Sequence, residues 1–318
     1  MHRNIKVRNF GLRSRDATRA LITAYQLKGG SYSANATVKT ALKSFTDHLK
    51  NTYNIKDLRK VEHKHVISFA KLLNQRFIEG KISASTAQNY LSPVNVALEN
   101  ARLDKKCRVE GVKDVGLPTR TGIARQDYSA TKDLHEKTIQ SVSERLAVHL
   151  NLQRELGLRL KESCLIDANQ ALEQAIRNNM VLIEFGTKGG RTREVPIYSQ
   201  EQMKALESAA LMQGKETSLI PKDQTWAQYQ SQVYREIASH TLCFHQERHH
   251  YANNLYQILM GEKSPVQSKV KHNQHVKFIS KALGITISEA KERDMQVRML
   301  VAKFLGHSRI SITNNYLG

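Results

Sequence analysis

The residues of this 318-residue sequence that are best suited to chemistry lie in four short stretches of its second half. They are Arg159 and Glu162 in GLRLKE, Lys188 in TKGG, His245 and Arg248 in FHQERH, and His307 and Tyr316 in LGHSRISITNNY. Apart from the glutamate, the set holds two arginines, two histidines, a lysine and a tyrosine. These residue types suit a reaction in which cations hold a phosphodiester while a phenol attacks its phosphorus atom.

Each residue type has a physical role in such a reaction. In-line attack builds negative charge on the phosphate oxygens, and two arginines neutralise it without a metal because each presents a planar, permanently charged fork. Free tyrosine has a pKa of ~10, but nearby cations favour its phenolate and a histidine can accept its proton. A lysine on a mobile hairpin can protonate the leaving oxygen. The covalent link to tyrosine conserves the bond energy, so we expect neither ATP nor any other cofactor.

Taken singly, each residue also has an ordinary structural explanation. Arg159 and Glu162 could form a surface ion pair, Lys188 could be a solvated turn residue, and His245 could be a core histidine with its hydrogen bonds satisfied. Tyr316 could be a packing residue near the end of the sequence. The chemical interpretation therefore depends on the residues acting together.

Several histidines around these stretches raise the question of a zinc site. The candidates are His240, Cys243, His245, His249, His250, His272 and His275. Their spacing matches no common zinc motif, so we expect no metal. For His249 and His250 we expect a role in packing or as polar neighbours.

The elements that must carry these residues are mostly helical. Apolar residues recur at helical spacing in two stretches: Val38, Leu42, Phe45 and Leu49, then Val66, Phe69, Leu73 and Phe77. A third helix is expected within 83–101. Strand-like runs at 181–185 and 194–197 flank Gly189 and Gly190, which supply the positive φ angles of a hairpin turn. Most of the chain after residue 200 is expected to be helical.

The pattern divides the chain into four parts. Residues 1–30 form a basic segment, with six Lys or Arg and one acidic residue in the first twenty. We expect a solvated tail or an arm lying on phosphates there. Residues 31–105 form a helical domain, residues 106–129 an interdomain linker rich in glycine and charge, and residues 130–318 a second domain.

Composition points to a nucleic-acid partner. Lys and Arg number 49 against 29 Asp and Glu, a formal net charge of +20, and 40% hydrophobic residues suffice for a folded core. No apolar run is long enough to span a membrane, and no signal peptide is recognisable. Three separated cysteines (Cys107, Cys164 and Cys243) are typical of reduced thiols, so we expect a cytoplasmic protein.

These motifs, in this order, resemble those of the tyrosine recombinases, the family of phage-type site-specific integrases. The stretch GLR-x-x-E at 157–162 resembles the first arginine motif of the family, and TKGGRTREVPI at 187–197 resembles its lysine hairpin. The stretch H-x-x-R-H-x-x-A at 245–252 resembles its second arginine box, and LGHS at 305–308 with Tyr316 resembles its closing motif. The motifs cover about 150–318, and 35–105 is diffusely similar to the core-binding domain.

The resemblance implies a role for each residue. Tyr316 would be the nucleophile that forms a 3′-phosphotyrosyl bond, and Arg159 and Arg248 would clamp the scissile phosphate. Lys188 would be the general acid. His245 and His307 would bond the phosphate and assist proton transfer, and Glu162 would support Arg159. The residues expected to contact DNA are Arg191, Arg193 and Arg309.

The resemblance also implies a fold and partners. The fold would be mainly α with a small antiparallel β element (α+β), an all-helical core-binding domain followed by a catalytic domain. Four protomers would act on two double-stranded DNA recombination sites, with a possible DNA-bending accessory protein, in a nucleoid-associated setting of bacterial or phage origin. The expected role of integrating or excising a mobile element competes with two alternatives, a non-catalytic DNA-binding protein of repressor type and a type IB-like topoisomerase.

Three features depart from the family pattern. The gap from Arg248 to His307 is 59 residues (307 minus 248), longer than is usual, and we assign the excess to an inserted helical segment at about 261–298. Glu247 stands where an apolar residue is more common, and we expect it to point away from the site. Only Leu317 and Gly318 follow Tyr316, so we expect the inserted segment to help hold the tyrosine and couple protomers.

Overall fold

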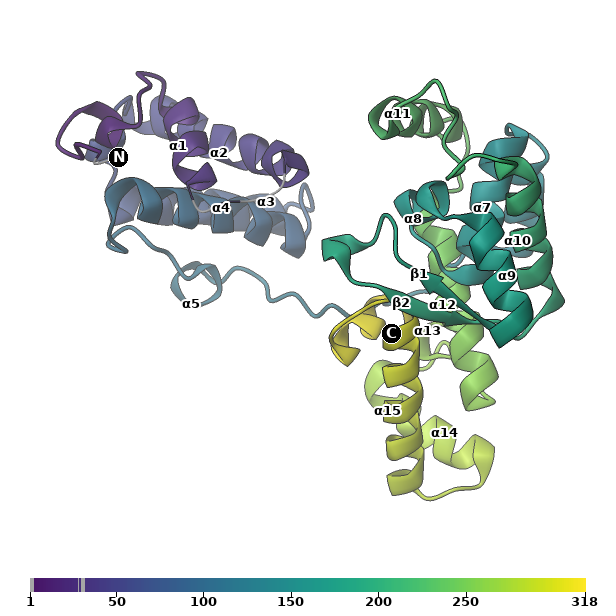
Figure 1. Ribbon diagram of the computed structural model, residues 1–318. Helices are drawn as coiled ribbons and strands as arrows, with labels where there is room; N and C mark the ends of the chain where they lie inside the picture. The colour runs from purple at the N-terminus through teal and green to yellow at the C-terminus, as the bar shows by residue number, and fades with distance from the viewer. Residues whose placement is uncertain (1–2, 28, 30–31) are drawn as a thin grey trace. The chain divides into compact units, whose positions relative to one another are not determined.

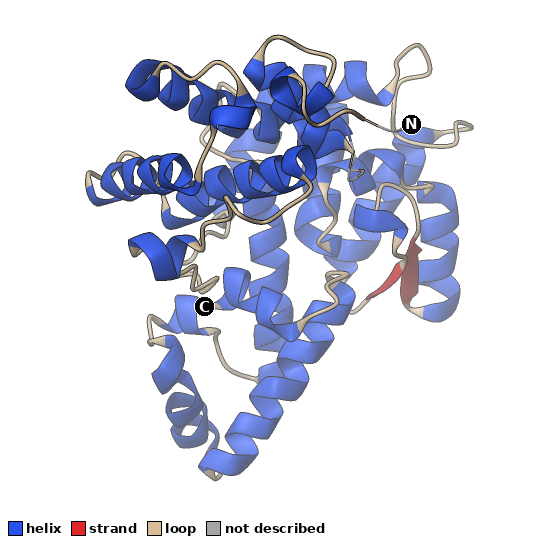
Figure 2. Ribbon diagram, turned by 90° about the vertical axis from the view of Figure 1, so that its left-hand side faces the viewer, coloured by secondary structure: helices blue, strands red, loops and turns tan. Residues whose placement is uncertain are grey.

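The computed structural model describes residues 3–27, 29 and 32–318, and it divides into two compact units, 1–121 and 122–318. Residues 1, 2 and 28, and residues 30 and 31, lie outside the described residues, together with the part of the basic-segment prediction that falls on them. Helices dominate, and the strands of unit 2 form one small sheet (Figures 1 and 2). The predicted mainly helical fold with a small antiparallel β element is therefore confirmed.

Unit 1 consists of helices around its own apolar core. Its elements are η1 (Arg8–Gly11), α1 (Ala17–Gln26), α2 (Tyr32–Tyr53), η2 (Leu58–Lys60), α3 (His63–Ile78), α4 (Ala84–Arg102) and α5 (Gly111–Val115). The predicted stripes on α2 and α3 supply much of the core, since Leu42, Phe45 and Phe69 are fully buried. The rings of Phe45 and Phe69 meet edge to face with centroids 5.2 Å apart.

Parts of the predicted basic segment and of the predicted linker belong to the folded core of unit 1. Residues 8–26 include η1 and α1, and Phe10 and Leu21 are buried in the core of unit 1, so this stretch is not a solvated tail. Cys107 and Leu117 belong to the same core, although they fall in the predicted linker. In both stretches a few apolar side chains pack into the core of unit 1, and this tertiary packing decides the outcome.

Unit 2 begins with helices around the sheet. The elements before the second arginine motif are α6 (Lys132–Ile139), α7 (Glu144–Leu156), α8 (Leu160–Leu165), α9 (Ala168–Asn178), β1 (Met180–Ile183), η3 (Lys188–Gly190), β2 (Arg193–Pro196), α10 (Gln200–Gln213) and α11 (Trp226–Ile237). Strands β1 and β2 are antiparallel, with Val181 opposite Val195. Both valines are fully buried, so the register places the apolar side of the hairpin in the core of the unit.

The rest of unit 2 carries the remaining motif residues. Its elements are α12 (Phe244–Met260), α13 (Pro265–Ser268), η4 (His272–Gln274), α14 (His275–Leu283), α15 (Ile287–Phe304), η5 (Ile310–Thr313) and α16 (Asn314–Leu317). The segment 261–298 thus contains α13, η4, α14 and most of α15. Helices α14 and α15 lie side by side in both ribbon views (Figures 1 and 2).

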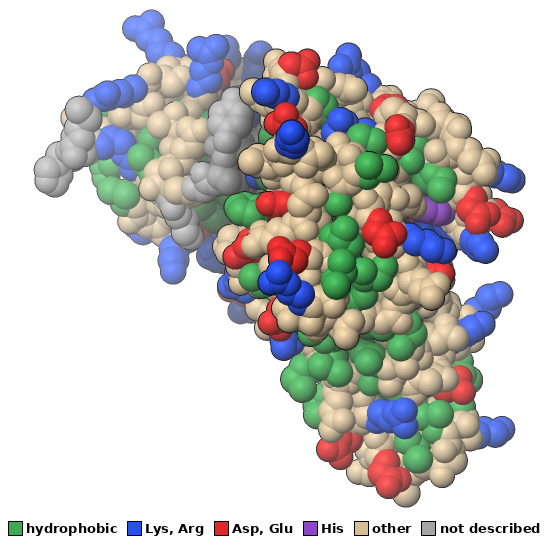
Figure 3. Space-filling model, turned by 45° about the vertical axis from the view of Figure 1, so that its right-hand side comes forward, with side chains coloured by type: hydrophobic (Ala, Val, Ile, Leu, Met, Phe, Trp, Pro, Cys, Tyr) green, Lys and Arg blue, Asp and Glu red, His purple; other side chains and the backbone are tan. Residues whose placement is uncertain are grey.

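Helix α15 has clear local signals at both ends. At its start, the Thr286 hydroxyl accepts from the Glu289 backbone N–H, and the Glu289 carboxylate accepts from Thr286 in return. After its end, Gly306 has a φ of 70°, the left-handed conformation in which a glycine commonly terminates a helix. The helix buries Val301 and exposes Met295 and Met299, and hydrophobic side chains gather on this lower part of the molecule among scattered charged ones (Figure 3).

Candidate functional site

Arg159 lies at the start of α8, directly after a sharp turn of the chain. Helix α7 ends at Gly157, whose φ is 61°, and a Cβ added there would lie 2.3 Å from the Tyr251 ring. Only glycine therefore fits at this position, where the chain leaving α7 meets the Tyr251 ring of α12. The backbone N–H of Arg159 donates to Glu162 Oε2 at 2.7 Å, and its Nη1 donates to Oε1 at 2.6 Å. Glu162 thus fixes both the backbone and the side chain of Arg159.

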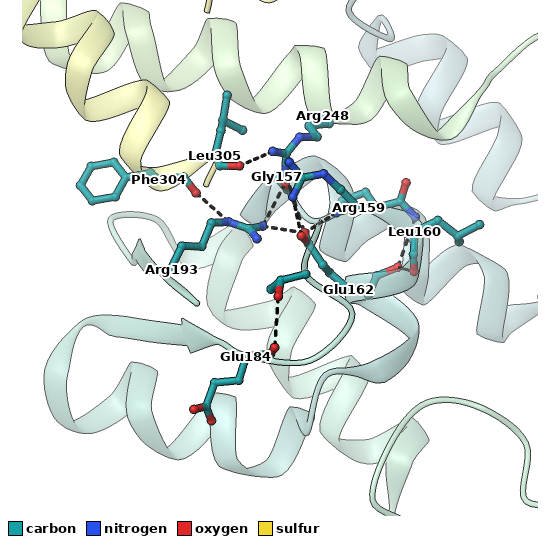
Figure 4. A network of polar contacts seen from close by, with 12 residues as sticks. Gly157, Arg159, Leu160, Glu162, Glu184, Arg193, Arg248, Phe304 and Leu305 are labelled. Carbon is teal, nitrogen blue, oxygen red and sulfur yellow. Dashed lines mark hydrogen bonds and ion pairs between the residues drawn. The ribbon is translucent and has the colours of Figure 1, made fainter. Parts of the chain in front are cut away.

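Glu162 is the centre of a buried network of three arginines (Figure 4). It is fully buried, and Arg193 Nη2 donates to its Oε2 at 2.7 Å. Arg248 Nη1 lies 3.9 Å from the same oxygen. Although burial opposes ionisation, Arg193, Arg248 and Arg159 hold the pKa of Glu162 at about 2. The carboxylate is therefore charged and binds the cations that surround it.

Arg248 reaches across three segments of the chain. Its side chain is almost completely buried, and its Nη1 and Nη2 donate to the backbone oxygens of Gly157 and Leu305 (Figure 4). Its Nε donates to the hydroxyl of Tyr316 at 3.4 Å. Burial lowers the pKa of Arg248 to about 10, so the guanidinium remains a cation at neutral pH.

The ring of Tyr316 lies among three histidines. Its centroid is 5.5 Å from that of His245, 4.7 Å from that of His249 and 5.6 Å from that of His307. His245 and His249 are one turn apart at the start of α12, and His307 follows the stop of α15 at Gly306. Two segments, the start of α12 and the residue after Gly306, therefore converge on a tyrosine that is only 4% exposed.

These histidines are neutral at pH 7. Burial, followed by the charge of Arg248, lowers the pKa of His307 to about 3 and also lowers the pKa of His245. Burial and the neighbouring His245 lower the pKa of His249 to about 4. Among the described residues, buried His307 Nε2 and His249 Nδ1 have no hydrogen-bond partner. A neutral imidazole with a free nitrogen can accept a phenolic proton or bond a phosphate.

Lys188 lies apart from this cluster. It begins the turn between β1 and β2, and it is exposed. Gly189 and Gly190 have φ angles of 76° and 70°, as the predicted turn requires. Arg191 and Arg309 are also exposed, and both line a hollow with His307 between the hairpin and the end of α15.

Two charged side chains around the network are bound within the protein. Arg193 is 5% exposed, and its Nε donates to the backbone oxygen of Phe304 at 2.8 Å, although it also lines the hollow with Arg191 and Arg309. That it contacts DNA stays a prediction. Its charge is used inside the protein, by Glu162. Glu247 is also fully buried, and its two oxygens meet His135 and Arg154, each at 2.8 Å. Both partners lie outside the cluster around Tyr316, which agrees with the expectation that Glu247 points away from the site.

Sequence reasoning missed two members of the site. His249 was expected to be a packing or polar neighbour, but its ring is the nearest of the three to Tyr316. Its spacing from His245, four residues along a helix, is a signal that both point from one face. Arg193 gave no such signal, because its partners Glu162 and Phe304 are far away in sequence.

Among residues 3–27, 29 and 32–318, no three His, Cys, Asp or Glu side chains are grouped to hold a metal ion.

The cluster can bind an anion and supply a nucleophile. Arg248 presents a positive charge beside the hydroxyl of Tyr316. Arg159 is a quarter exposed, and its charge helps to lower the pKa of His245 and of His307. The neutral histidines add proton acceptors. A phosphodiester bonded by these cations would have the phenol oxygen close to its phosphorus atom, and charge developing in the transition state would meet preorganised donors.

Residues 119–254 match the family model described as Integrase. No curated protein sequence matches the chain. No helix in the described part of the chain is long and apolar enough to cross a membrane.

Three solved structures share the fold. The first is a lambda integrase tetramer bound to a Holliday junction, 18% identical over 75% of this chain and 72% of that one, with a TM-score of 0.52. The second is XerH site-specific recombinase bound to palindromic difH substrate, 16% identical over 95% and 81%, with a TM-score of 0.54. The third is the Tn1549 transposon integrase in complex with circular intermediate DNA, 12% identical over 94% and 95%, with a TM-score of 0.53.

Proposed function

We infer that this chain belongs to the tyrosine recombinase family and is a site-specific DNA recombinase, an integrase that cuts and rejoins DNA strands. The family match over 119–254 and the shared fold support the assignment. The observation that carries it is the approach of the Tyr316 hydroxyl to Nε of Arg248, at 3.4 Å, within a ring of neutral histidines. A tyrosine in this position has a cation nearby that can bind the phosphate under attack, and a histidine that can accept the phenolic proton.

Cleavage would begin when Arg159 and Arg248 bind the non-bridging oxygens of the scissile phosphate. The Tyr316 oxygen attacks phosphorus and loses its proton to a neutral histidine, His307 or His245. The bond from phosphorus to the 5′ oxygen breaks, leaving a 3′-phosphotyrosyl link and a 5′-hydroxyl end. The negative charge that develops is met by guanidinium groups already held in place by Glu162, so little reorganisation is needed.

The leaving 5′ oxygen needs a proton, and Lys188 is the proposed donor. An ammonium on an exposed turn is free of the buried arginine network and can approach the DNA. Rejoining is the reverse: a 5′-hydroxyl attacks the phosphotyrosyl phosphorus, and Tyr316 leaves as its phenol. The phosphodiester energy is kept in the covalent link, so the sequence prediction of a reaction without ATP follows from this chemistry.

DNA is the proposed substrate because of the charge as well as the site. The net charge of +20 favours a polyanion, and exposed Arg191 and Arg309 line the hollow beside His307. We further propose that a homotetramer acts on two recombination sites in the cytoplasm, integrating or excising a mobile element. Dependence on a DNA-bending accessory protein stays a prediction, which reaction of purified components would test.

The test is formation of a covalent protein–DNA adduct. Purified protein is incubated with a cognate site that carries a nick near the cleavage position, so that the released fragment diffuses away. Native protein should yield an adduct on a denaturing gel, and the Tyr316→Phe variant should bind DNA without yielding one. Tyr53→Phe is the matched control, because Tyr53 lies in unit 1 and is exposed.

The outcomes separate the alternative classes. An adduct that persists in Tyr316→Phe contradicts the nucleophile assignment, and no adduct on any cognate site favours a binding protein of repressor type. Plasmids with two sites separate a recombinase from a type IB-like topoisomerase, because only the recombinase exchanges strands between sites.

A further inference from the structure

Helix α16, which carries Tyr316, is too short to be stable by itself. It spans Asn314–Leu317, whereas isolated helices need on the order of 12–15 residues to form in water. Tyr316 and Leu317 are nevertheless buried. Contacts from outside the helix must therefore hold it, and they determine where the tyrosine hydroxyl lies.

One guanidinium spans both ends of α16. Arg298 of α15 donates from Nη1 to the side-chain oxygen of Asn314 at 2.9 Å. It donates from Nη2 to the backbone oxygen of Gly318 at 3.1 Å. The two acceptors stand before and after Tyr316, so the fork of Arg298 fixes the helix at two points.

The guanidinium is itself fixed from behind. Its Nε lies 3.1 and 2.9 Å from the two carboxylate oxygens of Asp294, one turn earlier on α15. The hydroxyl of Tyr256 donates to Asp294, and the guanidinium carbon lies 5.8 Å from the Tyr256 ring centroid. Arg298 is only 5% exposed, so its orientation is set by protein contacts.

The other side of α16 is held through α12. Asn253 donates from Nδ2 to the backbone oxygen of Tyr316 at 3.3 Å, and Ser264 donates to Asn253 Oδ1 at 2.5 Å. Gly318 lies so close to Val266 that an added Cβ would be 2.8 Å from it. These contacts fix the backbone of α16, whereas the side chain of Asn314 is bonded by Arg298.

We propose that Arg298 is a positioning residue for the nucleophile and that its pair of contacts with Asn314 and Gly318, anchored by Asp294, forms a latch on α16. The proposal rests on the proposed function, because it assigns the latch to the chemistry of Tyr316. The latch holds the tyrosine beside Arg248 of the same chain. It also links the inserted segment, which ends at Arg298, to catalysis.

The test removes one contact of the latch and leaves its anchor intact. Asn314→Ala deletes the acceptor on α16 and keeps the pair of Arg298 and Asp294. The control is Asn315→Ala, because Asn315 is exposed and its side chain donates to the nearby backbone oxygen of Ile312. For each variant we would measure the single-turnover rate of adduct formation at saturating protein, the affinity for DNA, and hydrogen exchange of the Gly318 amide.

We expect Asn314→Ala to slow adduct formation roughly tenfold or more, because small misplacements of reacting groups are costly. Its affinity for DNA should stay unchanged, and its Gly318 amide should exchange faster. Asn314→Asp should restore the rate, since a carboxylate accepts from Arg298. Arg298→Lys should be slow, because an ammonium cannot reproduce the fork.

Two results would overturn the latch while leaving the proposed function intact. The first is that native protein forms the Tyr316 adduct and the Asn314→Ala variant forms it just as fast. The other is a slow Asn314→Ala variant that loses DNA affinity in proportion or is not rescued by Asn314→Asp. Absence of an adduct from the native protein overturns the proposed function itself, and the latch with it.

Discussion

The carboxylate of Glu162 should contribute more to the stability of unit 2 than an ordinary buried glutamate, and Glu162→Gln tests this. The substitution keeps the size of the side chain and removes the charge that Arg159, Arg193 and Arg248 share. Burial alone would favour the neutral form, yet the pKa of Glu162 falls from 4.5 to about 2. That lowering corresponds to on the order of 3 kcal/mol of folding free energy at neutral pH.

The sign of the pH dependence follows from the direction of the pKa change. The folded pKa lies below the unfolded one, so the contribution is fully present above pH ~4.5 and is lost as pH falls toward 2. Glu162→Gln should therefore lower the free energy of unfolding by about 3 kcal/mol at pH 7. The difference in the free energy of unfolding between the variant and native protein should be smaller at pH 3.5 than at pH 7, by roughly 1 kcal/mol.

Urea denaturation at several pH values, followed by circular dichroism, measures both quantities. Glu155→Gln is the matched control, because burial raises the pKa of Glu155, so folding disfavours its charge. That variant should be as stable as native protein at pH 7, or more stable. The reasoning is refuted if Glu162→Gln leaves the stability at pH 7 unchanged, or if the two glutamine variants lose the same amount.

Three further predictions follow from the site and its surroundings. Lys188→Ala should slow cleavage by about 10²–10⁴-fold when the leaving group is the ordinary 5′ oxygen, but not when it is a 5′ sulfur, which leaves without a proton. The control is Lys204→Ala, an exposed lysine of α10, which should slow cleavage of neither substrate. In denaturation and salt titrations, Arg193→Gln should cost about 3–5 kcal/mol of stability, whereas Arg191→Gln should leave stability unchanged and reduce the salt slope of DNA binding by about 1. Burial lowers the pKa of His149 to about 3, so the stability that depends on its neutral form is lost as pH falls from ~6.5 toward 3. In urea denaturation, His149→Gln should reduce the slope of the free energy of unfolding against pH across that range by up to ~1.4 kcal/mol per pH unit.

Each of these has a contrary result. Equal slowing of the oxygen and sulfur substrates by Lys188→Ala would remove the lysine from proton transfer. A stable Arg193→Gln variant with a weaker salt slope would show that Arg193 acts in DNA binding and not in holding Glu162. An unchanged pH dependence in His149→Gln would show that its burial is not the source of the acid sensitivity.

Local features of the fold could be predicted from the sequence because they depend on neighbouring residues. The helix stop at Gly306 and the turn at Gly189 and Gly190 each require a positive φ, which only glycine adopts at little cost. The paired strands followed from a short run of β-forming residues on either side of that turn. The helices of unit 1 followed from apolar spacing.

The arrangement of the site depends on contacts between distant residues, so the sequence could not give it. Arg191 and Arg193 are both basic residues of one hairpin, but the first is exposed and the second is buried against Glu162. Nothing in the spacing TKGGRTRE separates them. Arg298 lies in a segment that the motifs do not cover, and only its contacts with Asn314 and Gly318 reveal it.

The central claim is that Tyr316 is the residue that becomes joined to DNA. Its most direct test is peptide mapping by mass spectrometry of the adduct formed on a nicked cognate site, after digestion of both protein and DNA. The account predicts a nucleotide joined through its 3′ phosphate to Tyr316, with a free 5′-hydroxyl on the released strand. A nucleotide joined to any other residue, or through a 5′ phosphate, would contradict it.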